Sequence, residues 1–127
     1  MTKIPSLHEN PENLSTSVVD RHWAIASLME ELEAVDWYDQ RVEATIDEEL
    51  RSILAHNRDE EKEHAAMVIE WLRRNDETFE RHLKTYLFSD RSIVALELED
   101  TESGVTEDEA DNSISLHIGS LRTESAE

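Results

Sequence analysis

Apolar residues recur every three or four positions through the chain from about residue 15 to residue 90. Between Ser15 and Arg41 neither glycine nor proline interrupts this pattern, and one face carries Ala24, Leu28, Glu31, Val35 and Tyr38. Such spacing is typical of a helix that turns one side inward. We therefore predict a first helix over residues 15–41 and a short connection over residues 42–46.

A second long helix is predicted from Asp47, which is a suitable N-cap, to about Arg74. Acidic residues follow Asp47 in the first turn and Arg73 precedes Arg74 in the last turn, so both ends suit the helix dipole. The inward stripe mixes apolar and polar positions: Leu50, Ile53, Leu54, Asn57, Glu61, His64, Val68 and Trp71. A third, shorter helix is predicted after Asp76, and a further turn or two around residues 93–96.

Two helices of about 27 residues are each about 40 Å long. Joined by a short connection they form an antiparallel hairpin, which has two apolar stripes but no complete core. The third helix is too short to cover those stripes, because helical bundles usually need three or more long helices to enclose a core. We therefore predict an all-α fold: an antiparallel two-helix hairpin plus a short C-terminal helix, which dimerises into a four-helix bundle.

The chain is strongly acidic, with 31 Asp plus Glu against 12 Lys plus Arg and a formal net charge of −19. This charge argues against nucleic acid and anionic membranes as partners and favours cations. The chain has no cysteine, which excludes disulfides and thiolate metal sites and fits a cytoplasmic protein. No apolar run is long enough to cross a membrane, and the N-terminus has no apolar segment typical of a secretory signal.

The charge is distributed unevenly, since ten of the acids and only one base fall in the last 31 residues. A run of like charges repels itself and buries little surface, which is typical of disorder. We predict an N-terminal arm over residues 1–14, a helical domain over residues 15–96 and an acidic disordered linker over residues 97–112. A tail over residues 113–127, with an apolar island in its centre, completes the chain.

The polar residues inside the predicted stripes carry the candidate chemistry. Glu61 and His64 are three residues apart, so both side chains project from one side of a helix, and Glu31 holds an inward position on the first helix. Buried charges are normally paired or bound to metal. Ferritin-like di-iron bundles use two Glu-x-x-His motifs and two further glutamates, all turned inward. This chain has one of each, so a two-fold dimer would supply the whole set at the subunit interface.

Carboxylate and imidazole ligands suit iron, manganese or zinc. The alternative is that Glu61 and His64 form a surface pair, which arises often by chance in so acidic a chain. Tyr38 continues the stripe of Glu31 and is either a partner of a metal ligand or a tyrosine at the edge of the core.

Several residues flank the inward positions, and their role can be interpreted in two ways. Glu30 and Glu33, and with them Glu60 and Glu63, either attract Fe(II) electrostatically or form a solvated helix face. Trp37 and Trp71 are expected in the core or an interface. Three histidines have no acidic neighbour at ligand spacing that can be phased: His22, His56 and His82.

The two long helices also carry a family resemblance. Residues 29–41, from Met29 to Arg41, resemble the first-helix signature of the encapsulated ferritins, and residues 53–67 and 70–76 are similar to their second helix. The resemblance implies a half-ferritin subunit that dimerises to complete a di-iron ferroxidase centre, with dimers assembled into a ring-like decamer. The family's metal ligands fall on Glu31, Glu61 and His64, with Tyr38 beside the centre. Its metal-access acids fall on Glu30 and Glu33, with Trp37 close to them.

The tail resembles a family feature as well. Residues 116–122 are similar to the C-terminal peptide that holds family members inside an encapsulin shell and contains a Gly-Ser-Leu-like core. The docking positions implied are Leu116, Ile118, Gly119, Ser120 and Leu121. The resemblance therefore implies the encapsulin shell protein as a partner and a location in the cytoplasm, inside an encapsulin nanocompartment. The alternative is an accidental apolar cluster in a disordered tail.

These observations predict a ferroxidase that oxidises Fe(II) to Fe(III) with oxygen and supplies iron for storage inside the compartment. A rival hypothesis is a non-catalytic metal-buffering cargo protein, in which calcium or zinc also occupies acidic sites. A third is a structural adaptor, a helical dimer that only carries the docking peptide.

Overall fold

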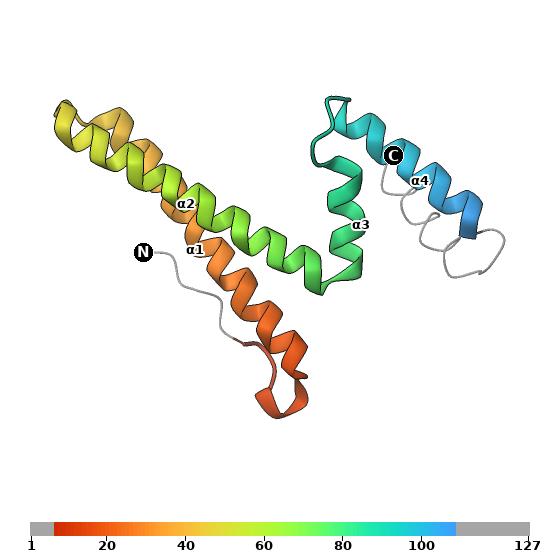
Figure 1. Ribbon diagram of the computed structural model, residues 1–127. Coiled ribbons are helices and arrows are strands. Elements are labelled where there is room, and N and C mark those ends of the chain that lie inside the picture. Colours follow the sequence, from red (N-terminus) through yellow and green to blue (C-terminus); the bar gives the residue numbers. More distant parts are fainter. Residues whose placement is uncertain (1–6, 109–127) are drawn as a thin grey trace. The chain divides into compact units, whose positions relative to one another are not determined.

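The computed structural model describes residues 7–108, which form helices joined by short loops (Figure 1). A short 3₁₀-helix, η1 (Pro11–Asn13), precedes four α-helices. These are α1 (Thr16–Ala44), α2 (Glu48–Asn75), α3 (Glu77–Tyr86) and α4 (Ile93–Asp108). The described residues contain no strand, so the all-α prediction is confirmed. No helix in this part of the chain is long and apolar enough to span a membrane.

Local side-chain caps fix where the helices begin. The Ser15 hydroxyl accepts a hydrogen bond from the Val18 amide at 3.2 Å, and the Asp47 carboxylate accepts one from the Leu50 amide at 2.9 Å. Asp76 caps α3 in the same way. The predicted starts of the first three helices are therefore confirmed. The first helix ends three residues later than predicted, at Ala44, because nothing in residues 42–44 breaks a helix.

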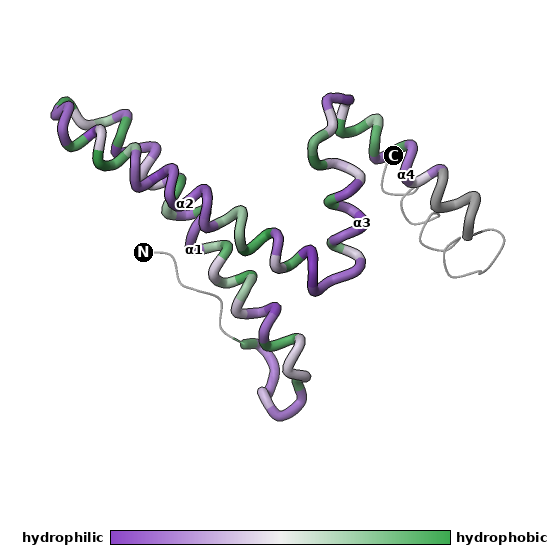
Figure 2. The backbone as a smooth tube through the Cα atoms, viewed as in Figure 1, coloured by the Kyte–Doolittle hydropathy of each residue, from purple (hydrophilic) through white to green (hydrophobic). Residues whose placement is uncertain are grey.

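α1 and α2 form the expected antiparallel hairpin, and a loop of three residues joins them (Figure 1). Hydrophilic and hydrophobic residues alternate along both helices (Figure 2). In the hairpin the buried apolar residues are Ala26, Ala65 and Leu72, while large apolar side chains such as Trp23 (58% exposed) and Met67 (64%) remain open. A single hairpin therefore leaves apolar surface that a second layer of helices would cover.

The core residue Leu72 should dominate the stability of the hairpin, because only 1% of it is exposed. Leu72→Ala is expected to lower the free energy of unfolding of the metal-free protein by about 3 kcal/mol. Ile46→Ala is the matched control: Ile46 is 93% exposed, so its change should stay within about 0.5 kcal/mol. Urea unfolding of both variants at one protein concentration measures this. Equal losses would contradict the assignment of the core.

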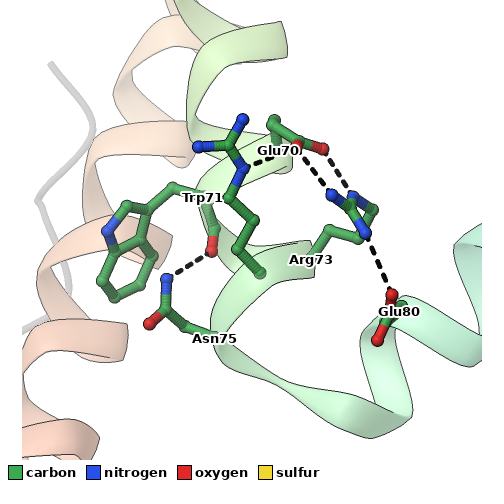
Figure 3. A network of polar contacts seen from close by, with 6 residues as sticks. Glu70, Trp71, Arg73, Asn75 and Glu80 are labelled. Atoms are coloured by element: carbon green, nitrogen blue, oxygen red, sulfur yellow. Dashed lines mark hydrogen bonds and ion pairs between the residues drawn. The ribbon is translucent and has the colours of Figure 1, made fainter.

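A polar network joins the end of α2 to the start of α3 (Figure 3). Arg73 donates to both carboxylate oxygens of Glu70, at 2.6 and 2.8 Å, and to Glu80 at 3.0 Å, while Arg74 donates to Glu70 at 2.7 Å. The hydrogen bonds from Arg73 and then Arg74 lower the pKa of Glu70 to about 2. Glu70 therefore stays ionised, and the network stabilises the turn at Asp76.

Residues 81–108 form a second compact unit, which contains the end of α3 and α4. Leu96 is buried in this unit, and Arg91 pairs with Glu99 on α4. The structure differs here from the predicted disordered linker, since residues 97–108 continue α4. The Ser92 hydroxyl caps this helix, and the leucines and glutamates that follow favour it. The end of the predicted linker and the predicted docking tail, with Leu116 to Leu121, lie outside the described residues.

Candidate metal centre

Three predicted ligands come together midway along the hairpin. Glu31 reaches from α1, and Glu61 and His64 reach from neighbouring turns of α2, with one ligand atom of each within 4.8 Å of the others. His64 Nδ1 lies 3.6 Å from Glu31 Oε2 and 3.7 Å from Glu61 Oε2. The three side chains are half-buried, so part of each is accessible from outside the hairpin.

The Glu61 carboxylate acts on the neighbouring Glu31 carboxylate. The pKa of Glu31 is raised, first by a hydrogen bond with Glu61, then by burial and by the negative charge of Glu61, while His64 acts in the opposite direction. Two carboxyl groups with oxygen atoms within 4.8 Å of one another repel each other when both are ionised. A divalent cation supplies the positive charge that this pair needs, and the oxygen and nitrogen donors suit iron, manganese or zinc.

Removing one of these charges should stabilise the metal-free fold. Glu31→Gln is expected to raise the thermal midpoint of the metal-free protein at pH 7 by about 2–5 °C, because an amide can donate to Glu61 without repelling it. Scanning calorimetry with a chelator present measures this. The control, Glu43→Gln, removes an exposed acid from the same helix and should leave the midpoint unchanged. A fall in the midpoint of the Glu31 variant would contradict the repulsion argument.

Tyr38 and Trp37 lie farther along α1, where one cation contacts both rings. The Arg41 guanidinium carbon is 5.5 Å from the centroid of the Tyr38 ring and 5.9 Å from that of Trp37. Both aromatic residues are half-buried. These cation–π contacts tie both rings to Arg41, one turn farther along α1.

The structure does not group the predicted access acids with the metal ligands. Glu30 is exposed and Glu33 is half-buried, and within residues 7–102 neither belongs to a group of three candidate ligands. Their role in metal access stays a prediction.

A second group was missed in the sequence. Glu60, Glu63 and His64 also bring ligand atoms within 4.8 Å of one another, and His56 Nε2 lies 3.4 Å from Glu60 Oε1. The expectation that His56 lacks an acidic neighbour at a useful spacing is wrong. The separation of four residues on one helix is the signal that could have found this pair.

The hairpin and its three inward ligands define a class of protein. One Glu-x-x-His motif and one further inward glutamate, on two long helices, are half of the ligand set of the ferritin-like di-iron carboxylate bundles. Comparison with known proteins places the chain more narrowly within this class. A family model described as EncFtn-like matches residues 6–90, and the chain therefore belongs to this family of encapsulated ferritins.

Individual relatives agree with the family. The chain is 58% identical to the encapsulated ferritin-like protein of Rhodospirillum rubrum, over 95% of this chain and 91% of the relative. It is 53% identical to a ferritin-like protein of Thermotoga maritima, over 76% of this chain and 84% of the relative. The fold is also similar to the crystal structure of a Nitrosomonas europaea protein, with a TM-score of 0.68 and 57% identity. That match covers 70% of this chain and 98% of the other.

Proposed function

We propose that this protein is a ferroxidase, in which two chains join their Glu31, Glu61 and His64 side chains into one di-iron centre. The observation that carries the proposal is the convergence of these three ligands on a single hairpin. One hairpin holds half of the ligand set of a ferritin-like bundle and half of its helices. A two-fold axis beside the cluster completes both at once.

The substrate of the reaction is Fe(II). Each ion loses one electron to dioxygen, which takes up protons and leaves as hydrogen peroxide after two electrons or as water after four. The chain's own residues would bind and orient the ions: Glu61 is proposed as the ligand shared by the two irons, and His64 and Glu31 as the ligands that would complete the coordination of each. Tyr38 is proposed to support the centre. Glu30 and Glu33, with Trp37 near them, are proposed to guide Fe(II) toward it.

The family also supports a proposal for the assembly and the location of the protein. We propose a decamer built as a pentamer of dimers, which is held inside an encapsulin shell through residues 113–127. An open ring does not enclose a mineral, so the Fe(III) is stored within the shell. The name of the Rhodospirillum rubrum relative, an encapsulated ferritin-like protein, supports this proposal.

A non-catalytic metal buffer is the second candidate. The group of Glu60, Glu63 and His64, with its two exposed carboxylates, favours it, since calcium or zinc suits such acidic sites. Oxygen uptake separates the two functions. Fe(II) is added to the protein under air in an oxygen electrode, and Fe(III) is followed by absorbance. A ferroxidase consumes oxygen in proportion to the iron added, well above the rate of Fe(II) in buffer. A metal-buffering protein would bind the iron without oxidising it, so the rate of oxygen uptake would be no higher than that of Fe(II) in the assay solution alone.

A further inference from the structure

Four residues of α2 recur at intervals of seven along one stripe: Arg51, Arg58, Ala65 and Leu72. Residues seven apart return to nearly the same side of a helix. Ala65 and Leu72 are 5% and 1% exposed, which marks this stripe as one that packs inward. Arginines hold the first two positions, where a packed helix seam would ordinarily carry apolar residues.

Both arginines bond to the C-terminal part of α1 or to the loop after it. Arg58 Nη1 donates to Asp39 Oδ1 at 3.0 Å, and its Nε donates to Asp59 Oδ1 at 3.1 Å on its own helix. Arg51 Nε donates to the Val42 carbonyl oxygen at 3.2 Å, and Arg51 also donates to the Thr45 carbonyl. The Arg58 side chain is only 23% exposed, and its guanidinium group is held between the carboxylates of Asp39 and Asp59.

The candidate metal centre lies directly beyond these contacts. Glu61 follows Arg58 by three residues, and across the hairpin it meets Glu31, which has the same charge. Repulsion between two carboxylates works against close packing of α1 and α2 at this level. Sliding one helix by a single residue moves its side chains by about 1.5 Å. Metal–ligand distances tolerate only about 0.2 Å, so the register of the two helices decides whether a site exists.

We propose that Arg58, through its pair with Asp39, is a positioning residue that fixes the register of α1 against α2 and so preforms the half-centre of Glu31, Glu61 and His64. Arg58 does not touch the metal. The inference rests on the proposed function only in taking these three residues as metal ligands. It adds that each chain presents them in place before the partner or the metal arrives.

Electrostatics alone makes the opposite prediction for Arg58. Removing a positive charge so near to Glu61 should strengthen the binding of a cation. A positioning role requires weaker binding instead. The sign of the change therefore separates the two explanations.

The test measures the affinity of the full-length protein for Co(II) alone, followed by the visible absorption of the bound ion. Arg58→Gln and Asp39→Asn are each expected to weaken binding by about tenfold, as loss of an outer partner does elsewhere. Arg58→Lys keeps the positive charge but loses the two-sided hydrogen bonding of the guanidinium group, so its affinity for Co(II) should lie between those of the parent and Arg58→Gln. Asp36→Asn is the matched control, because Asp36 is an exposed acid of α1 that accepts a hydrogen bond from Gln40 in the same helix, at 3.2 Å. Its affinity should stay within about twofold of the parent.

Unchanged or tighter binding by Arg58→Gln would overturn the inference, as would equal losses in the Asp39 and Asp36 variants. Thermal unfolding of each variant confirms that it is folded at the assay temperature. Oxygen uptake with Fe(II) is measured on the same samples. If the parent binds Co(II) but oxidises no Fe(II), the proposed function fails and the positioning role stands. If the parent oxidises Fe(II) and Arg58→Gln binds Co(II) as the parent does, the positioning role fails and the proposed function stands.

Discussion

Glu61→Gln is expected to reduce oxygen-dependent Fe(II) oxidation by at least about 100-fold, beyond the loss typical of an outer partner. Each centre is proposed to draw on both chains, so one substitution removes two carboxylates from every site. An amide is a poor ligand for Fe(II) and carries no charge to balance it. Initial rates of oxygen uptake at a fixed Fe(II) concentration measure the effect.

Glu43→Gln is the matched control for this variant, since Glu43 is an exposed acid near the end of α1. Its rate should equal that of the parent. A Glu61 variant that keeps more than about half of the rate would place the chemistry elsewhere, with the group of Glu60 and Glu63 as the remaining candidate. If both variants lost activity equally, general negative charge and not a defined centre would be responsible.

Removal of residues 113–127 is expected to lower the amount of this protein inside encapsulin shells by at least about tenfold, because the proposed docking peptide is lost from every chain and the avidity of the oligomer is lost with it. The truncated and full-length proteins are each co-expressed with an encapsulin shell protein. Intact shells are purified by size, and the cargo they contain is quantified on denaturing gels.

Two controls sharpen this experiment. Removal of residues 124–127 alone spares the apolar island and should leave loading unchanged. Ferroxidase activity of the isolated truncated protein should equal that of the parent, since the helical domain is intact. Equal loading of the shell by the full-length and truncated proteins would show that the docking signal lies outside the tail.

Much of the fold could be predicted because its determinants are local. Ser15, Asp47 and Asp76 cap helices through their own side chains, and these signals depend only on the neighbouring residues. The convergence of Glu31 with Glu61 and His64 was also predictable. A polar residue in phase with an apolar stripe lies on the same face, and a short loop forces the two stripes together.

The remaining features depend on contacts that hydrophobic periodicity does not detect. The stripe of Arg51 and Arg58 faces α1 although it is charged, because hydrogen bonds to carbonyls and to Asp39 offset its burial. Charge alone predicts disorder for the acidic segment after Leu96. Leucine and glutamate are good helix formers, however, and Arg91 pairs with Glu99, so α4 continues to Asp108.

The most direct test of the two-chain centre is a crystal structure of the protein soaked in Fe(II), with the iron located by its anomalous scattering. The proposed function predicts two iron ions beside a two-fold axis, with Glu31, Glu61 and His64 of both chains as ligands. Iron bound by the ligands of one chain alone would contradict it. Iron at Glu60 and Glu63 with none at Glu31 would contradict it equally.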